Sequence, residues 1–171
     1  YFGGGMNAIV FQEMREARGL AYSASGRLLE PEYKDDSYKY FAFIATQNDK
    51  MQTAIEAFDE IINDMPESET AFNIAKEALA ARCRTERITG RNILSSYRTA
   101  REMGITEPRS KKVYESLPAL TLEDVKNTQE KWVKDRTYCY GILGDIKNLD
   151  TGYLKTLGTV EILTLEDIFG Y

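Results

Sequence analysis

The chemistry open to this chain is set by its reactive side chains and their spacing. It contains no histidine and only two cysteines, Cys83 and Cys139. Without an imidazole, a Ser-His-Asp triad, a Cys-His pair and a histidine-ligated zinc site are excluded. Two cysteines distant in sequence form neither a disulfide framework nor a cysteine zinc site, so we expect both to be small buried hydrophobes. No metal site is predicted in this chain.

Two groups of charged side chains are of types that can do chemistry. Glu56, Asp59 and Glu60 fall on the outer face of one expected helix, where paired carboxylates can do acid–base work. On a helix of this kind such residues usually form a solvated face, so we assign them no chemistry. Four arginines gather where one expected helix ends and the next begins: Arg82, Arg84, Arg87 and Arg91. They can bind phosphate or an acidic peptide, but cations also suit a helix C-terminus, and that interpretation is preferred.

The third candidate is a pair of residues, Arg15 and Tyr22, that stand seven positions apart in residues 1–29. Gly19 between them can take the left-handed conformation that ends a helix, and Leu20 supplies the hydrophobic contact that often follows such a cap. Arg15 and Tyr22 are therefore expected to flank one helix-to-strand corner.

The elements around this corner follow from the hydrophobic pattern. Gly3, Gly4 and Gly5 allow an open turn, and Asn7 can cap the helix that follows. The helix has an apolar stripe at helical spacing, formed by Val10, Phe11 and Met14. From Ala21 the period shortens to that of a strand, with Tyr22, Ala24, Gly26 and Leu28 on one face.

The pattern of the whole chain predicts a single α+β domain over residues 1–171. Its sheet should be of the antiparallel type, with helices packed on one face. Residues 38–46 should pair with the first strand as an antiparallel hairpin whose two faces are both covered. Helices are expected over 51–65, from Ser68, over 93–103, from Thr121 and over 149–157, with Trp132 in the core. Asn48 or Asp49 should cap the first of these helices, and the helix from Ser68 should bury a stripe at Ala71, Ile74, Ala75, Ala78 and Leu79. Two further strands are expected at 138–143 and 159–163.

Composition bounds the partners and the compartment. The 171 residues are 43% hydrophobic and carry a net charge of -5, which disfavours nucleic acid and anionic membrane surfaces as partners. No run is apolar enough to span a bilayer, and no signal peptide is visible. The chain begins at Tyr1 with a turn and a helix, so we expect the first strands and helix of the domain to lie upstream. A soluble cytoplasmic or periplasmic location is compatible with these features.

Phe11 to Tyr22, read as Phe-Gln-Glu-Met-Arg-Glu-Ala-Arg-Gly-Leu-Ala-Tyr, resembles the C-terminal, non-zinc-binding domain of the pitrilysin family of zinc metallopeptidases. The resemblance implies the LuxS/peptidase-like metalloenzyme fold. It also implies that Arg15 and Tyr22 reach into a cavity and contact a peptide substrate. Gly3, Gly4 and Gly5 resemble a break between two helices that is a longer glycine-rich loop in one processing-peptidase subunit of the family, which implies a substrate-binding role.

The same resemblance places zinc in a partner N-terminal domain that carries His-x-x-Glu-His, either on the same polypeptide or on a separate subunit. This chain would then be inactive alone and form the far wall of the substrate chamber. Arg15 would donate hydrogen bonds to a peptide carbonyl, and the Tyr22 hydroxyl would stabilise the oxyanion. A purely structural interpretation is an ion pair between Arg15 and a neighbouring Glu, with Tyr22 as an aromatic at the sheet edge.

Two other functions stay open. One is a non-peptidase assembly subunit of the same family, such as a respiratory-complex core protein. The other is a peptide-binding module that adds an extended peptide to the edge of the hairpin.

Overall fold

A computed structural model describes residues 1–31 and 33–171 of the chain, and its centre is one antiparallel hairpin. The hairpin consists of β1 (Ser23–Leu29) and β2 (Lys39–Ala45). It is preceded by α1 (Ile9–Phe11) and the π-helical segment η1 (Gln12–Ala17), and followed by η2 (Asn48–Lys50) and α2 (Met51–Asn63). The later elements are α3 (Glu69–Thr85), α4 (Ile93–Glu102), α5 (Arg109–Ser116), η3 (Leu117–Ala119), α6 (Leu122–Trp132), η4 (Ile146–Asn148), α7 (Thr151–Leu157) and α8 (Leu165–Phe169).

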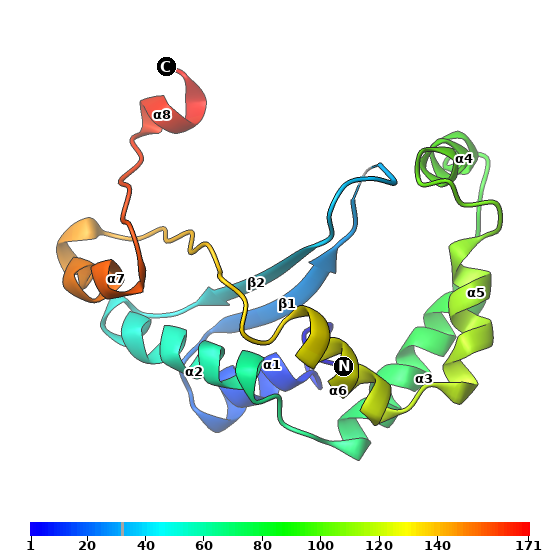
Figure 1. Cartoon of the computed structure of the whole chain (residues 1–171), viewed down its shortest axis with the longest axis horizontal. Coiled ribbons are helices and arrows are strands. Elements are labelled where there is room, and N and C mark those ends of the chain that lie inside the picture. The colour runs from blue at the N-terminus through cyan, green and yellow to red at the C-terminus, as the bar shows by residue number, and fades with distance from the viewer. Residues whose placement is uncertain (32) are drawn as a thin grey trace.

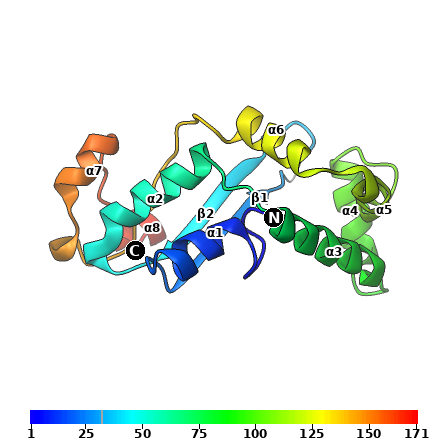
Figure 2. The same cartoon turned by 90° about the horizontal axis from the view of Figure 1, so that it is seen from below.

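The helices closest to the hairpin lie on one side of it. Figures 1 and 2 show α1 and α2 across the same face of β1 and β2, while α3, α4 and α5 form an arm at one end of the molecule and α7 and α8 lie at the other. The predicted α+β class, with an antiparallel sheet and helices on one face, is confirmed. The two strands pair from Ser23 with Ala45 to Leu29 with Lys39.

The hydrophobic core lies between the hairpin and α2. Alternation along β1 turns Ala24 and Gly26 toward the helices, because successive side chains point to opposite faces of a strand. On α2, an apolar residue every three or four positions gives one continuous buried stripe. The central buried cluster consists of Val10, Met14, Ala24, Ala54, Ala57, Phe58, Ile61, Ile62 and Val133.

The opposite face of the hairpin is not covered as expected. Phe41 and Phe43 lie across from Arg27 and Ser25, and all of these four side chains are exposed. The Arg27 guanidinium lies 5.2 Å from the Phe41 ring centroid, which shields part of that ring. The sequence pattern of β2, apolar on both sides, had indicated two covered faces, and one of them is open to solvent in the described structure.

Helix ends follow the capping signals in most places. Ser68 accepts a hydrogen bond from the Ala71 N–H at the start of α3, and Thr121 with Asp124 forms a full capping box at the start of α6. The predictions for Asn7, Asn48 and Asp49 were wrong. The N-cap of α1 is Ala8, which has no side-chain hydrogen bond to offer. The N-cap of α2 is Lys50, because a turn of 3₁₀ helix that contains Asn48 and Asp49 already precedes α2.

Several predictions for the second half of the chain were also wrong. Residues 138–143 and 159–163 are not strands, and a short helix, α8, follows the second of these segments. Trp132 is 64% exposed, because α6 turns this last residue away from the core and buries Gln129 instead. The expected stripe on α3 is only partly covered, and its buried aromatic is Phe72.

Two hydrogen bonds attach α6 and the turn that follows it to the end of α2. The buried Gln129 side chain donates through Nε2 to the Ile62 carbonyl at 2.6 Å, and the Asp135 N–H donates to Asn63 Oδ1 at 2.9 Å. If α6 moved, the buried Gln129 amide would lose its hydrogen bond while staying out of water, which costs free energy. The first hydrogen bond therefore strongly favours this position of α6. Val133 is thereby brought into the central cluster.

Tyr40 on β2 places its hydroxyl among apolar atoms. The phenol packs against Phe2 and the core, and its oxygen has no hydrogen-bond partner within residues 1–31 and 33–171. Burial, with a smaller contribution from Tyr138, raises the pKa of Tyr40 well above its usual value. A raised pKa means that the folded state favours the neutral phenol. Its stabilisation is therefore complete below the unfolded pKa of 10.0 and is lost as the pH rises above it.

We therefore expect Tyr40→Phe to leave the free energy of unfolding unchanged or slightly higher at neutral pH, since no hydrogen bond is lost. Above pH 10 the variant should lose less stability than the parent chain. Urea midpoints at neutral and alkaline pH measure both effects, with Tyr38→Phe, at a half-exposed position, as the control. A clear loss of stability in Tyr40→Phe at neutral pH would contradict this assignment.

Candidate functional site

The corner between η1 and β1 is a helix end built on a wide turn. The Arg18 N–H donates to the Glu13 carbonyl five residues back at 3.2 Å, which is the hydrogen-bond pattern of a π-helix. Gly19 then reverses the chain with a positive φ of 58°, as predicted. Met14 is fully buried and fixes this turn to the core. The backbone that carries Arg15 is thus held from both sides.

Arg15 and Tyr22 meet at this corner. The Arg15 guanidinium carbon lies 4.9 Å from the Phe11 ring centroid and 5.9 Å from that of Tyr22. Tyr22 is 84% exposed, and its backbone N–H donates to the Ala45 carbonyl at 2.9 Å. The predicted corner is therefore confirmed. Cation–π contact with two rings restricts the guanidinium and still leaves its N–H donors available to a ligand.

The ion pair expected between Arg15 and a neighbouring glutamate is present but weak. Its Nε lies 3.6 Å from Glu16 Oε1, and both side chains are about half exposed. That separation exceeds a hydrogen bond, and exposed ion pairs of this type contribute about 0–1 kcal/mol. The ion pair therefore does not commit Arg15 to Glu16.

A shallow depression of about 340 Å³ lies beside Tyr22. Its rim includes Gln47 and Lys50, and Lys50 Nζ donates to the Gly19 carbonyl at 3.2 Å. Sequence reasoning did not select Lys50, because 31 residues separate it from Gly19 and only closure of the hairpin brings them together. The depression offers a cation and polar groups next to the exposed phenol.

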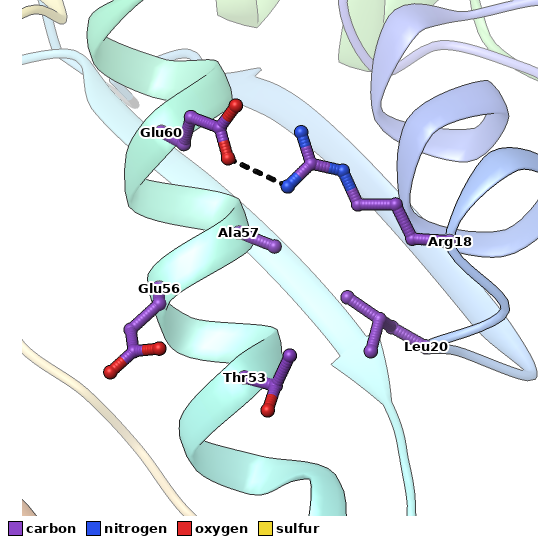
Figure 3. A pocket seen from close by; sticks show the side chains of 6 residues that line it. All are labelled: Arg18, Leu20, Thr53, Glu56, Ala57 and Glu60. Atoms are coloured by element: carbon purple, nitrogen blue, oxygen red, sulfur yellow. Dashed lines mark hydrogen bonds and ion pairs between the residues drawn. The ribbon is translucent and has the colours of Figure 1, made fainter.

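A second depression, of about 320 Å³, separates the corner from α2 (Figure 3). Arg18 Nη1 donates to Glu60 Oε2 at 2.7 Å across it, and Arg18 Nε lies 3.7 Å from Glu13. The hydrogen bond to Arg18 lowers the pKa of Glu60 and, with the reverse sign, raises the pKa of Arg18. Glu60 is thus a partner of Arg18 and stays ionised, which suits positioning of the corner and does not suit general acid catalysis.

The other carboxylates of α2 have ordinary partners. Gln52 donates to Glu56, and Asn63 donates to Asp59. All three α2 carboxylates are exposed, in line with the solvated face expected for them.

The three glycines occupy different surroundings. The Gly26 N–H donates to the Gly3 carbonyl at 3.3 Å, and a Cβ on Gly3 would lie 2.1 Å from the Gly26 oxygen. A Cβ on Gly4 or Gly5 would meet nothing within 4 Å. Gly3 is therefore pressed against Gly26 in the middle of β1. Gly26 lies four residues after Tyr22, so Gly3 is not at the corner itself.

Gly3→Ala should destabilise the chain by about 1–3 kcal/mol, because the added methyl overlaps backbone atoms that cannot rotate away. Gly4→Ala is the matched control, and it should change the free energy of unfolding by about 0.5 kcal/mol or less. Thermal or urea midpoints of the two variants compare them directly. Equal midpoints would show that the segment before α1 does not rest on β1 as described.

Other reactive groups are dispersed. Cys83 is half-buried and Cys139 exposed, so the expectation that both are buried was wrong for Cys139. Within the described ranges, no three cysteine or carboxylate side chains are grouped so as to hold a metal ion. In the same part of the chain, no helix has the length and hydrophobicity needed to cross a bilayer.

Comparison with known families gives a match to the first part of the chain. Residues 1–79 match the family described as Peptidase M16 inactive domain. The matched segment makes up a little less than half of the chain. The resemblance to the pitrilysin-type non-zinc-binding domain is thereby confirmed for the segment that holds the corner, the hairpin and α2. No curated protein matches the chain.

The M16 assignment agrees with the absence of histidine. The matched family is described as an inactive domain, and the Arg15–Tyr22 corner lies inside the matched residues. The match ends within α3, so it includes neither the arginines at the end of that helix nor the C-terminal helices.

Proposed function

We propose that this chain is the non-catalytic half of a zinc-dependent endopeptidase, that it forms a wall of the substrate chamber, and that Arg15 and Tyr22 act on the bound peptide. The observation that carries the proposal is the pairing of an exposed guanidinium with an exposed phenol, 5.9 Å from guanidinium carbon to ring centroid, on an anchored corner inside an M16 inactive domain. Zinc and the activated water belong to an N-terminal peptidase domain, on the same polypeptide or on a separate subunit.

The two side chains suit different parts of the reaction. A guanidinium presents several donors in one plane and can hold peptide carbonyls in the ground state. A phenol can donate one hydrogen bond to the oxygen that becomes negative when water attacks. Gly3 contributes to the position of β1, and the roles of Gly4 and Gly5 in substrate binding rest on their exposure beside it.

Complementation with the zinc-bearing domain tests the proposal. The chain alone should hold no stoichiometric zinc and should not cleave a quenched-fluorescent peptide. Addition of the separately prepared zinc domain should produce hydrolysis that neither component gives alone. Equal hydrolysis by the zinc domain without this chain would contradict the proposal, and a stable complex without hydrolysis would instead favour an assembly subunit.

A second candidate is peptide binding by β-augmentation, and the form of the sheet favours it. In the described residues the sheet has two strands, and the N-terminal segment reaches β1 through the bond between Gly26 and Gly3. β2 is then the outer strand on which an extended peptide can pair. Binding of extended peptides by the chain alone, without a zinc partner, would support this function over the first.

A further inference from the structure

Charge is segregated in this acidic chain. Residues 80–101 contain six arginines and one glutamate, whereas residues 159–171 contain three carboxylates and no lysine or arginine. The chain as a whole has a net charge of -5. Two short segments of opposite sign therefore lie outside the part matched to the M16 family.

The basic segment also presents apolar side chains. It runs from the end of α3 through α4, and Ile88, Ile93, Leu94 and Tyr97 are each more than half exposed there. Around them lie the exposed arginines 82, 84, 91 and 101. Arg87 is used locally, because its Nη1 donates to the Arg84 carbonyl at 2.6 Å. Together these arginines and apolar side chains form a basic apolar surface.

The acidic segment has the complementary pattern. Thr164 and Asp167 form a capping box that starts α8, and the hydrogen bonds from Thr164 lower the pKa of Asp167. Leu165, Ile168 and Phe169 then share one face, since residues three and four apart are neighbours on a helix. All three are more than half exposed, as are Ile162 and Leu163 before them. The carboxylates Glu161, Glu166 and Asp167 lie among these apolar residues. We call residues 159–171 the acidic apolar tail.

The two surfaces cannot meet within one molecule as it is folded. Figures 1 and 2 both show α4 and α8 far apart along the long axis, with the hairpin between them. We propose that the acidic apolar tail of one copy docks on the basic apolar surface at α3 and α4 of a second copy. Apolar burial supplies the attraction, and the opposite charges fix the pairing.

If the basic apolar surface is called the head, this contact joins the head of one copy to the tail of the next. Such an interface uses two different patches, so it does not close on itself as a two-fold dimer does. We expect weak, concentration-dependent association that proceeds beyond dimers. The inference concerns residues 80–171 and is independent of the proposed peptidase function.

Sedimentation equilibrium of the whole chain over a dilution series, from micromolar to submillimolar, measures the association. The weight-average mass should rise with concentration. Raising the salt from low values to about 0.5 M should weaken the association at least about tenfold, because exposed charges are screened beyond a few ångströms. Association that is indifferent to salt would overturn the charge pairing.

Charge reversal gives the sharper test. The head variant, Arg84→Glu with Arg91→Glu, and the tail variant, Glu161→Arg with Glu166→Arg, should each self-associate at least about tenfold more weakly than the parent chain. Asp167 is left in place so that the cap of α8 survives. A mixture of the two variants should recover association that again proceeds beyond dimers, because the reversed head pairs with the reversed tail and the unchanged tail pairs with the unchanged head.

A control variant reverses charge elsewhere. Lys111→Glu with Lys112→Glu on α5 should associate as the parent does, and circular dichroism should show that all variants remain folded. A parent chain that stays monomeric throughout, or a variant mixture that fails to associate, would overturn the proposal.

Discussion

Tyr22→Phe should lower kcat of the assembled peptidase by about 10²–10³-fold, with little change in KM. The removed hydroxyl is a donor that matters more as the oxyanion develops than in the ground state, so kcat and kcat/KM should fall together. Because Tyr22 is 84% exposed, the substitution should not alter folding. Steady-state kinetics on a short quenched-fluorescent peptide, with zinc content checked, measure the effect.

Arg15→Ala should lower kcat as well and also raise KM, since a guanidinium that holds the peptide backbone contributes to ground-state binding. Arg15→Lys should restore little, because an ammonium lacks the planar fork of donors. Tyr38→Phe and Arg136→Ala change the same residue types at exposed positions and serve as controls. Near-normal rates for both Tyr22→Phe and Arg15→Ala would leave the domain a passive chamber wall.

The second large effect is on stability. Ile61→Ala should lower the free energy of unfolding by about 2–5 kcal/mol, because it empties part of a packed core. Ile61 is 1% exposed and lies in the central cluster. Urea midpoints measure the loss.

Trp132→Ala is the comparison that distinguishes burial from residue size. The indole is 64% exposed, and the described structure gives it a cation–π contact with Lys131 at 5.0 Å. We expect a loss of about 1 kcal/mol or less. A Trp132→Ala variant that is less stable than Ile61→Ala would contradict the exposed position of Trp132.

The parts of the fold that sequence reasoning predicted are those with local signals. The hairpin followed from two β-rich runs, α2 from one apolar stripe, and the starts of α3 and α6 from Ser68 and Thr121. Gly19 marked the corner because few other residues accept its positive φ. The order of elements through α2 was therefore predictable.

The remaining features depend on contacts between distant segments. An apolar run at residues 138–143 has strand character, but Tyr138 packs on the core and donates to the Val133 carbonyl at 2.5 Å without joining the sheet. The π-helical turn before Arg18 has no composition signal of its own. At the site, the spacing placed Arg15 and Tyr22 at one corner, whereas the approach of Lys50 and the Arg18–Glu60 pair required the closed hairpin.

The origin of the central cluster determines how the chain comes apart. Eight of its nine residues lie between Val10 and Ile62, and only Val133 comes from later in the chain. Elements that supply a buried core open with the highest free energy, so these segments should form the cooperative unit that opens last. Amide protons of β1, β2 and α2 should therefore exchange most slowly with solvent, and those from α3 onward should exchange first. The Arg15–Tyr22 corner belongs to the slow unit, so it keeps its shape while the outer helices open and close.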